Sequence, residues 1–445
     1  AINASNADVV LDESNKIGVI AANVKSLNLQ NAQALSIGTV KGISGITSIN
    51  NINITTLNGD LKIKNNIATA SSTNDAIVLN AGKNSNSGIK TGGNIIHENG
   101  ILTTGINGRV TLFTGGISES TGVSSLVNSG NFRYNSDEAA TNYTKSLGSG
   151  IFAVYREQPT IKISPDSKNI TYADTVSGLT YGSSGFVNGD DANILAGTAS
   201  FNINSTKSTS GHHIVGEHDI AYNSGLTNAL GYAISDDNST NNVLKVAKKV
   251  LTISGITAEN KTYDGTTNAT LISGTNFLIG LVSGDTVSGD FSSLSGVFLD
   301  KNAGNNKAIT ISGVTINGAD KDNYDITNQA STTANISKKD ITAVTDITAL
   351  NKTYDGTTDA ILVTTNAKFI GIVANDKLNI ATSKGTFEDK NVGTNKIVNI
   401  SNIALGGDDV NNYNLLSTIG STTADITTDP KPDPVDPKPE IKKIV

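Results

Sequence analysis

The chain has 445 residues, which is too long for one hydrophobic core and predicts about two to four domains. It contains no cysteine, methionine or tryptophan, so disulfides, thiolate catalysis and metal sites built on cysteine are excluded. The 33 Lys and Arg residues against 40 Asp and Glu give a formal net charge of −7, which disfavours nucleic acid and anionic membranes as partners. The sequence has no run of about 18 apolar residues, so it predicts no transmembrane helix, and no export signal is visible. Because residue 1 is alanine, we expect a processed chain or a piece of a longer one.

Glycine, asparagine and β-branched residues dominate the composition, which predicts an all-β chain of short strands and tight turns. Residues 1–112 contain no aromatic side chain and instead carry short aliphatic groups separated by Gly and Asn turns. Strands this short suit a right-handed parallel β-helix with roughly 20 residues per coil and about five or six coils. A glycine-rich sandwich is the alternative. The aliphatic groups lie at 9–11, 19–21, 27–29, 35–37, 43–46, 52–54, 61–63 and 77–79.

The next segment is rich in aromatic residues, which we expect to cap the open end of the aliphatic coils because terminal solenoid repeats need a cap. Two of the seven prolines, Pro159 and Pro165, follow it, and the other five lie in the tail after residue 429. That tail reads as a semi-rigid polyproline II spacer. The aromatic residues of the segment 113–158 are Phe113, Phe132, Tyr134, Tyr143, Phe152 and Tyr155.

Between the proline-containing regions the sequence repeats, with a period of about 90 residues. Lys261–Thr267 reads KTYDGTT and recurs as Lys352–Thr358, while Asp300–Gly304 recurs as Asp389–Gly393. Several landmarks keep this register, so we predict tandem modules. A weaker third copy precedes them. Three further sets of segments align between the copies: Asp322–Tyr324 aligns with Asn411–Tyr413, Thr171–Asp174 aligns with the KTYDGTT segments, and Gly189–Asp190 aligns with Gly284–Asp285 and Asn375–Asp376.

Within each module, alternating segments such as Ala308–Ser312 predict half-buried strands, and Asp-Gly pairs predict the turns. Each module is therefore expected to be a small β-sandwich or a β-grasp-like unit, with almost no linker to the next module. The predicted domains are a β-helix at 1–122, an aromatic-rich cap at 123–158, three modules at 159–248, 249–339 and 340–428, and a Pro-rich stalk at 429–445.

The KTYDGTT segments, each followed by Asp-Lys-Asn-x-Gly, resemble the YDG module, and residues 171–246 resemble the MBG module of the YGX type. Residues 37–46 and 59–63 resemble coils of filamentous-haemagglutinin-like β-helices, and 107–152 the terminal part of such a helix. These resemblances imply a two-partner-secretion exoprotein of a Gram-negative bacterium, exported by an outer-membrane partner and located on the cell surface or in the matrix. The family's amino-terminal secretion domain and C-terminal cysteine pair have no counterpart in this sequence, so we expect a portion of a longer exoprotein.

Two clusters carry residue types that bind metals. His212, His213 and His218 could bind zinc or nickel, but the glycines that flank them favour a solvated hairpin. Asp320, Asp322 and Asp325 have the carboxylate density of a calcium site but lack the spacing of a calcium-binding loop, so an acidic turn is the alternative. We predict no cofactor, with calcium kept as a possibility.

The repeated motif residues are expected to be structural rather than catalytic, because they recur in consecutive modules of one chain. Glycine would take positive φ, aspartate would accept local N–H groups, and tyrosine would anchor the strand in the core. These residues are Tyr263, Asp264, Gly265, Tyr354, Asp355, Gly356, Asp300, Asn302, Asp389 and Asn391.

The sequence therefore predicts a non-enzymatic, elongated surface adhesin or matrix protein whose modules act as a rigid stalk. Its partners would be glycans or proteins of host or bacterial surfaces. One alternative is a self-assembling filament subunit that uses its terminal segments, 1–10 and 441–445, as strand donors. A third hypothesis is a β-helical polysaccharide-binding or polysaccharide-degrading protein, although residues 1–112 offer no aromatic side chain to stack on sugars.

Overall fold

The computed structural model describes residues 1–274 and 277–429, so the predicted Pro-rich stalk lies outside the described residues except for Asp429. The described residues form two compact units, one made of residues 1–206 and 213–247 and the other of residues 207–212, 248–274 and 277–429. Among the described residues the only α-helix is α1 (Val123–Leu126), and nearly all other regular structure is β-strand. This confirms the predicted all-β class.

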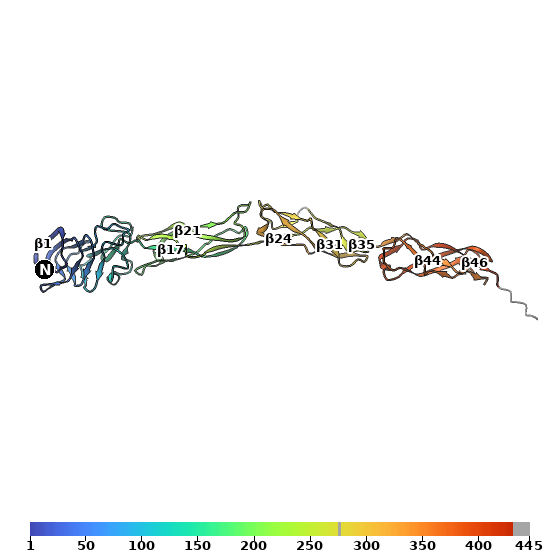
Figure 1. Cartoon of the computed structure of the whole chain (residues 1–445), viewed down its shortest axis with the longest axis horizontal. Helices are drawn as coiled ribbons and strands as arrows, with labels where there is room; N and C mark the ends of the chain where they lie inside the picture. Colours follow the sequence, from blue (N-terminus) through green and yellow to red (C-terminus); the bar gives the residue numbers. More distant parts are fainter. Residues whose placement is uncertain (275–276, 430–445) are drawn as a thin grey trace, which may run out of the picture. The chain divides into compact units, whose positions relative to one another are not determined.

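The first unit begins with coils (blue in Figure 1) whose parallel strands form one ten-stranded and one four-stranded sheet, and a small antiparallel pair lies beside them in the chain. The large sheet contains β1 (Ile2–Asn15), β3 (Ala22–Asn31), β7 (Ile46–Ser48), β8 (Ile52–Thr56), β10 (Ile67–Thr69), β11 (Ile77–Ala81), β13 (Leu102–Thr103), β14 (Arg109–Thr114), β15 (Phe132–Arg133) and β16 (Gly150–Tyr155). The second sheet contains β2 (Val19–Ile20), β4 (Leu35–Ile37), β9 (Leu61–Ile63) and β12 (Ile95–His97), and the pair is β5 (Thr39–Val40) with β6 (Ile43–Ser44). Each predicted aliphatic group lies wholly or largely on these strands, with only Ala21 and Gly45 falling between them.

The coils stack in register along their interior. Leu29 pairs with Ile54, Ile54 with Leu79, and Leu79 with Leu112, and all four side chains are fully buried. The coils are longer than the predicted 20 residues. Successive partners Leu27, Ile52, Ile77, Val110 and Ile151 are separated by 25, 25, 33 and 41 residues, because the loops between the strands lengthen along the chain.

The aromatic segment 123–158 does not end in solvent as a cap would. The rings of Phe132 and Tyr134 lie 6.3 and 5.8 Å from that of Tyr155 between centroids, and Tyr134 meets Tyr232 of the following module at 4.6 Å. All four side chains are buried. The predicted cap is therefore a joint, because the next module covers it within the same unit.

The module that follows in this unit has two sheets (green in Figure 1). One contains β17 (Thr160–Pro165), which pairs with β19 (Tyr181–Ser184) antiparallel and with β22 (Ala233–Asp236) parallel. The other has the order β18 (Lys168–Thr171), β23 (Val243–Ala247), β21 (Gly216–Asn228), β20 (Leu195–Asn204), with the short 3-10 helix η1 (Ala192–Ile194) before β20.

The second unit contains two modules with the same topology, as the sequence repeat predicts. Each has a five-stranded sheet and several smaller sheets of two or three strands, with aliphatic clusters in the core. No α-helix is present among the described residues of 249–428, so both modules are built of β-strands with one short 3-10 helix each.

The strands of the two modules follow the same order, although some strands that are continuous in one module are divided in the other. The first module contains β24 (Lys249–Ile253), β25 (Thr257–Ala258), β26 (Lys261–Thr262), β27 (Asn268–Ala269), β28 (Leu271–Ile272), β29 (Leu278–Ile279), β30 (Ser288–Asp290), β31 (Ser295–Phe298), β32 (Gly304–Ser312), β33 (Thr315–Asn317), η2 (Lys321–Asn323), β34 (Tyr324–Thr327) and β35 (Ser331–Ser337). The second contains β36 (Lys339–Ile341), β37 (Ala343–Thr345), β38 (Thr348–Ala349), β39 (Lys352–Thr353), β40 (Asp359–Ala360), β41 (Leu362–Val363), β42 (Lys368–Ile370), β43 (Asn379–Phe387), β44 (Gly393–Gly406), η3 (Val410–Asn412), β45 (Tyr413–Leu415) and β46 (Gly420–Thr427). The five-stranded sheets have the orders β26-β35-β32-β31-β27 and β39-β46-β44-β43-β40.

Candidate functional site at the module junction

The KTYDGTT motif closes a turn around a lysine ammonium group. Lys261 Nζ donates to Asp264 Oδ1 at 2.9 Å and to the carbonyl oxygens of Thr266 and Asn268, each at 2.9 Å. Asp264 Oδ1 also accepts the N–H of Thr266 at 2.9 Å, and Gly265 between them has φ 79°. Although burial opposes it, these hydrogen bonds hold the pKa of Asp264 below its ordinary value. We name this arrangement the lysine clasp.

The second copy repeats the clasp almost atom for atom. Lys352 Nζ donates to Asp355 Oδ1 at 2.8 Å, the N–H of Thr357 donates to the same oxygen at 2.9 Å, and Gly356 again has φ 79°. The hydrogen bonds from Lys352 and Thr357 lower the pKa of Asp355 to about 2. The motif's glycine and aspartate thus have the geometry that a tight turn requires.

The second repeated motif is also a turn held by a lysine. Asp300 accepts the N–H of Asn302 at 2.8 Å and the ammonium of Lys307, and Asp389 accepts the N–H of Asn391 at 2.8 Å. Lys396 supplies the ammonium in the second copy at 2.6 Å. In the first module this turn connects β31 to β32 and also contacts the second module through Lys301, Asn302 and Ala303.

Asp376 lies at the centre of the contact between the two modules. The hydroxyl of Tyr263, from the first module, donates to Asp376 Oδ2 at 2.8 Å, and the hydroxyl of Tyr413, from the second, donates to the same oxygen at 2.6 Å. Lys301 of the first module donates to Asp376 Oδ1 at 3.1 Å. The hydroxyl of Tyr413 also accepts the N–H of Val373 at 2.8 Å, which fixes its orientation.

This carboxylate is buried and charged. The Asp376 side chain is 3% exposed, and burial alone would raise its pKa. Hydrogen bonds from Tyr413, Tyr263 and Lys301 outweigh that effect and lower the pKa of Asp376. The same contact raises the pKa of Tyr413, first through burial and then through its bond to the carboxylate. A charge held by three donors away from water favours one fixed arrangement of its donors.

Further contacts surround the carboxylate. Asn412 Oδ1 accepts the N–H of Ala303 at 2.9 Å, and Asn412 Nδ2 donates to Asn302 Oδ1 at 3.2 Å. A Cβ on Gly265 would lie 2.7 Å from Val373 Cγ1, so the glycine is also needed for the close approach of the second module.

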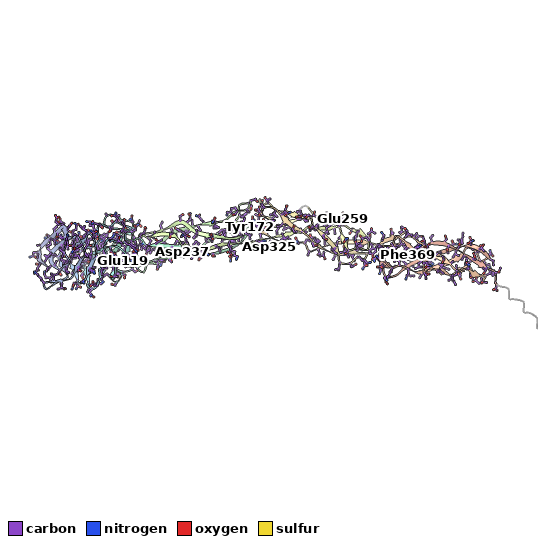
Figure 2. All side chains as sticks on the ribbon, viewed as in Figure 1. Glu119, Tyr172, Asp237, Glu259, Asp325 and Phe369 are labelled. Carbon is purple, nitrogen blue, oxygen red and sulfur yellow. The ribbon has the colours of Figure 1, made fainter. Side chains whose placement is uncertain are left out.

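An apolar cluster connects the cores of the two modules at this junction. It includes Tyr263, Phe298, Ile341 and Tyr413, and the half-buried Phe369 (labelled in Figure 2) packs against it. The junction therefore combines a buried charge with continuous apolar packing.

Comparison with known families agrees with the repeat. The model of the YDG domain matches residues 247–334 and 337–424. The chain contains two YDG domains. No curated protein matches the chain. The resemblance of residues 171–246 to the MBG module remains a prediction.

The first unit contains a joint with the same chemistry as the one between the YDG domains. Asp190 Oδ2 accepts the hydroxyls of Tyr134, from the coils, at 2.9 Å and of Tyr232, from the module, at 2.8 Å. The hydroxyl of Tyr232 accepts the N–H of Val187 at 3.1 Å, as Tyr413 does from Val373. Burial raises the pKa of Tyr134 and Tyr232. Joints at Asp190 and Asp376 therefore share one design, which we name the Tyr–Asp–Tyr joint.

The first YDG domain carries the corresponding acceptor. Asp285 Oδ2 accepts the hydroxyl of Tyr324 at 2.6 Å, and that hydroxyl accepts the N–H of Val282 at 3.0 Å. Asp285 also accepts the hydroxyl of Ser210, which lies in the segment 207–212 of the same unit. The aligned Gly-Asp and Asn-Asp pairs in the sequence mark these acceptors, but the sequence does not show what they bind.

The two motif tyrosines of the YDG domains differ in environment. Tyr263 is 1% exposed at the junction, whereas Tyr354 is 45% exposed. The expectation that tyrosine anchors the strand in the core is therefore wrong for Tyr354. Burial of this residue depends on the module that follows rather than on its own domain.

The candidate metal-binding histidines are not gathered into one site. His218 is buried on β21, and its Nε2 is 2.7 Å from the carbonyl oxygen of Ile214. The rings of His213 and His218 are 6.2 Å apart between centroids, while His212 belongs to the other compact unit. The expected solvated hairpin is thus wrong for His218. No group of three or more His, Asp or Glu suited to a metal occurs in the part of the chain that the structure describes.

The candidate calcium ligands each bond to protein donors. Asp320 is buried and accepts the N–H of Thr286 at 2.8 Å and both the N–H and the hydroxyl of Thr209. Asp322 pairs with the neighbouring Lys321 at 2.7 Å. Asp325, labelled in Figure 2, pairs with Lys248 at 3.4 Å. Asp320 therefore connects the segment 207–212 to the first YDG domain.

Two buried arginines were missed by the sequence analysis. Arg156 donates to the carbonyl oxygens of Ala81 at 2.7 Å and Gly93 at 2.6 Å, and burial lowers its pKa. Arg133 donates to four carbonyl oxygens and lies 5.5 Å from the ring centroid of Phe152. Their position in the sequence could have indicated a special role, since all three arginines of the chain lie between residues 109 and 156, beside the aromatic segment.

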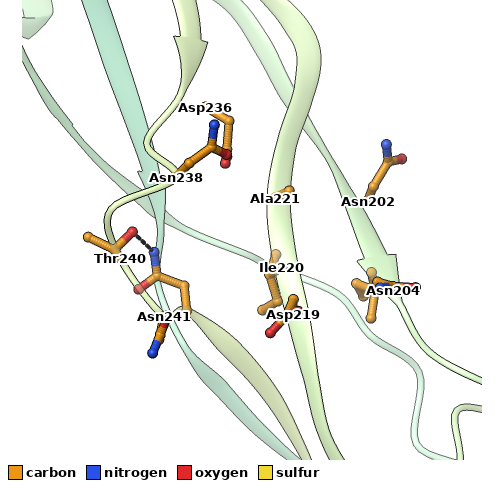
Figure 3. A pocket seen from close by; sticks show the side chains of 11 residues that line it. Asn202, Asn204, Asp219, Ile220, Ala221, Asp236, Asn238, Thr240 and Asn241 are labelled. Atoms are coloured by element: carbon orange, nitrogen blue, oxygen red, sulfur yellow. Dashed lines mark hydrogen bonds between the residues drawn. The ribbon is translucent and has the colours of Figure 1, made fainter.

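A polar cleft of about 630 Å³ opens between β20, β21 and the loop after β22 (Figure 3). Asparagine, aspartate and threonine side chains dominate its lining, including Asn202, Asn204 and Asp219. Asn242 Nδ2 donates to the hydroxyl of Thr240 at 2.5 Å across one side of it. Amide, carboxylate and hydroxyl groups of this kind can hydrogen-bond the hydroxyls of a sugar.

Proposed function

We propose that this chain is a non-enzymatic extracellular protein of a Gram-negative bacterium, an adhesin or matrix component whose modules act as a stiff spacer. The observation that carries the proposal is the buried Tyr–Asp–Tyr joint at Asp376. A carboxylate buried between two domains is costly when it loses its hydrogen-bond donors. Asp376 therefore favours one fixed contact between the two domains, which flexibly connected domains would not need.

The connection between the YDG domains supports stiffness as well. The last strand of the first domain, β35, ends at Ser337, and β36 of the second begins at Lys339. One residue therefore separates the two domains, and the joint at Asp376 adds bonds to both Tyr263 and Lys301. Short linkers combined with a specific interface restrict the relative motion of domains.

Distance measurements between spin labels test the stiffness. The chain has no native cysteine, so Leu299→Cys and Ile361→Cys, which replace side chains that are 81% and 70% exposed, allow one label in each YDG domain. We expect a single narrow distance distribution by pulsed electron paramagnetic resonance. The control is the same chain with a six-residue Gly-Ser insertion after Lys338, which should broaden the distribution. An equally broad distribution without the insertion would contradict the spacer function.

The extracellular location rests on the family resemblance of the YDG and coil sequences, and on that ground we propose export through an outer-membrane secretion partner. None of the described helices is long and apolar enough to span a membrane. Protease treatment of intact cells that produce the native protein tests the location. Digestion of the chain while cytoplasmic markers survive supports it, and protection of the chain contradicts it.

A filament subunit is the alternative function, favoured by one observation. Strand β1 runs for 14 residues and pairs only with β3 among the described residues, so its other edge is open to another strand. Ordered fibres of the purified protein in electron microscopy would favour this function, and monodisperse particles would favour the spacer.

The polar cleft favours glycans as the adhesive target. A glycan array probed with the whole chain tests this target. Binding that is lost in Asn202→Ala but kept in Asn53→Ala, an exposed position outside the cleft, would support a glycan site in the cleft. Binding that both variants keep would place the glycan contact elsewhere.

A further inference from the structure

The two YDG domains carry the same residues on the face that follows their lysine clasp, which we name the distal face. In the first domain it consists of Tyr263, Lys301, Asn302 and Ala303, all of which lie at the contact with the second domain. The aligned residues of the second domain are Tyr354, Lys390, Asn391 and Val392. Three of these four positions carry the same residue type, and the fourth exchanges one apolar residue for another.

The distal face of the second domain is already folded into the binding conformation. The clasp beside Tyr354 has the same hydrogen bonds and the same glycine φ as the clasp beside Tyr263. Only the surroundings differ, because Tyr354 is 45% exposed and Val392 48% exposed, whereas Tyr263 is 1% exposed. Exposed tyrosine and valine on a preformed surface are typical of an interface that lacks its partner.

What covers the first distal face identifies the occupant. It is the proximal face of the next domain, which we define as Val373, Asp376, Asn412 and Tyr413. We propose that the distal face of the second YDG domain binds the proximal face of a further β-module, whose buried aspartate accepts the hydroxyl of Tyr354 and pairs with Lys390. The tyrosine and lysine supply the donors, and the occupant supplies the carboxylate.

A second intact copy of this chain does not offer such a face. Asp376 and Asp190 are each taken by two tyrosines of the same chain, and Asp285 accepts Tyr324 and Ser210. The occupant is therefore a module whose proximal aspartate is not yet engaged. This inference does not depend on the proposed extracellular function.

Repeating residues 337–426 directly after Ile426 tests the proposal, because it recreates the sequence junction between the natural YDG domains. Trypsin cleaves after Lys352, so Thr353→Ser in the added copy gives its tyrosine-containing peptide a distinct mass. Tyrosine nitration followed by mass spectrometry then reports each Tyr354 separately. The reactivity of Tyr263 in the same digest shows that the chain remains folded.

In the natural chain we expect Tyr354 to be nitrated at least about tenfold faster than Tyr263, as their exposures imply. In the extended chain the original Tyr354 should slow to the rate of Tyr263, while the marked copy stays fast. Asp376→Asn in the added copy alone should restore fast nitration of the original Tyr354. Fast nitration of both tyrosines in the extended chain overturns the proposal, as does protection that Asp376→Asn leaves unchanged. Concentration-dependent protection of Tyr354 in the natural chain would assign the face to a second copy instead.

Discussion

Replacing Tyr263 by phenylalanine tests the joint between the YDG domains most directly. The change removes one hydroxyl and keeps the ring, so the packing and the position of Lys301 5.8 Å from the ring centroid are retained. What is lost is the 2.8 Å hydrogen bond to Asp376, which links one domain to the other. Tyr354→Phe is the matched control, because it makes the same chemical change in the same motif at a solvent-exposed position.

The expected magnitude follows from the charge of the acceptor. A hydrogen bond to an ionised group contributes about 1.5–3 kcal/mol, because the carboxylate left behind must find another donor. We therefore expect Tyr263→Phe to lower the free energy of opening the joint by about 1.5–3 kcal/mol. Tyr354→Phe should change it by less than about 0.5 kcal/mol, as surface substitutions commonly do.

Amide hydrogen exchange measures the joint without requiring two-state unfolding, which a multidomain chain does not follow. The N–H of Ala303 donates across the joint to Asn412 Oδ1 at 2.9 Å, so its exchange reports opening. Tyr263→Phe should speed that exchange by about 10- to 150-fold, which is the range that 1.5–3 kcal/mol implies. Unchanged exchange at Ala303, or an equal acceleration in Tyr354→Phe, would refute the reasoning.

Three further predictions concern the clasp, its glycine and the buried arginine. Hydrogen bonds lower the pKa of Asp355 from 3.8 to about 2. The clasp therefore contributes its full stability above pH 3.8 and loses that contribution as the pH falls through about 2. NMR titration of the Asp355 carboxyl group checks this, and a titration midpoint near 4 would contradict it. Gly265→Ala and Gly356→Ala share the strain of φ 79°, about 1–2 kcal/mol, but only Gly265→Ala also presses on the next domain, so it should lower the melting temperature more. Arg156→Met deprives two carbonyl oxygens of their donor and should cost about 1–3 kcal/mol in thermal unfolding. Arg109→Met loses a long 3.4 Å pair to the exposed Asp75, worth less than about 1 kcal/mol, so equal losses would refute the buried role of Arg156.

The sequence predicts the parts of the fold that depend on local patterns. Aliphatic groups such as 27–29 and 52–54 form stacked strands because alternating side chains on short strands have one inward face. The shared topology of the YDG domains follows from landmarks that keep one spacing. Coil length was underestimated because it depends on loops whose conformation carries no periodic signal.

The joint could not be predicted from the sequence, for physical reasons. Tyr263 and Asp376 are 113 residues apart, and Asp376 lies in an Asn-Asp pair that reads as an ordinary turn. Nothing in the sequence distinguishes Tyr263 from Tyr354, because the difference lies in whether another module is packed against the residue. A solvated hairpin was predicted around His218 because Gly211 and Gly216 suggest a loop, whereas in the structure β21 already begins at Gly216.

The recurrence of one joint at Asp190 and Asp376 gives the chain a standard connection between neighbouring elements. At both places one carboxylate holds a tyrosine of the preceding element and a tyrosine of its own module. A YDG repeat inserted directly after another would bring the same donor and acceptor types together, so we expect the insertion of a whole YDG repeat to require no new kind of contact at that boundary.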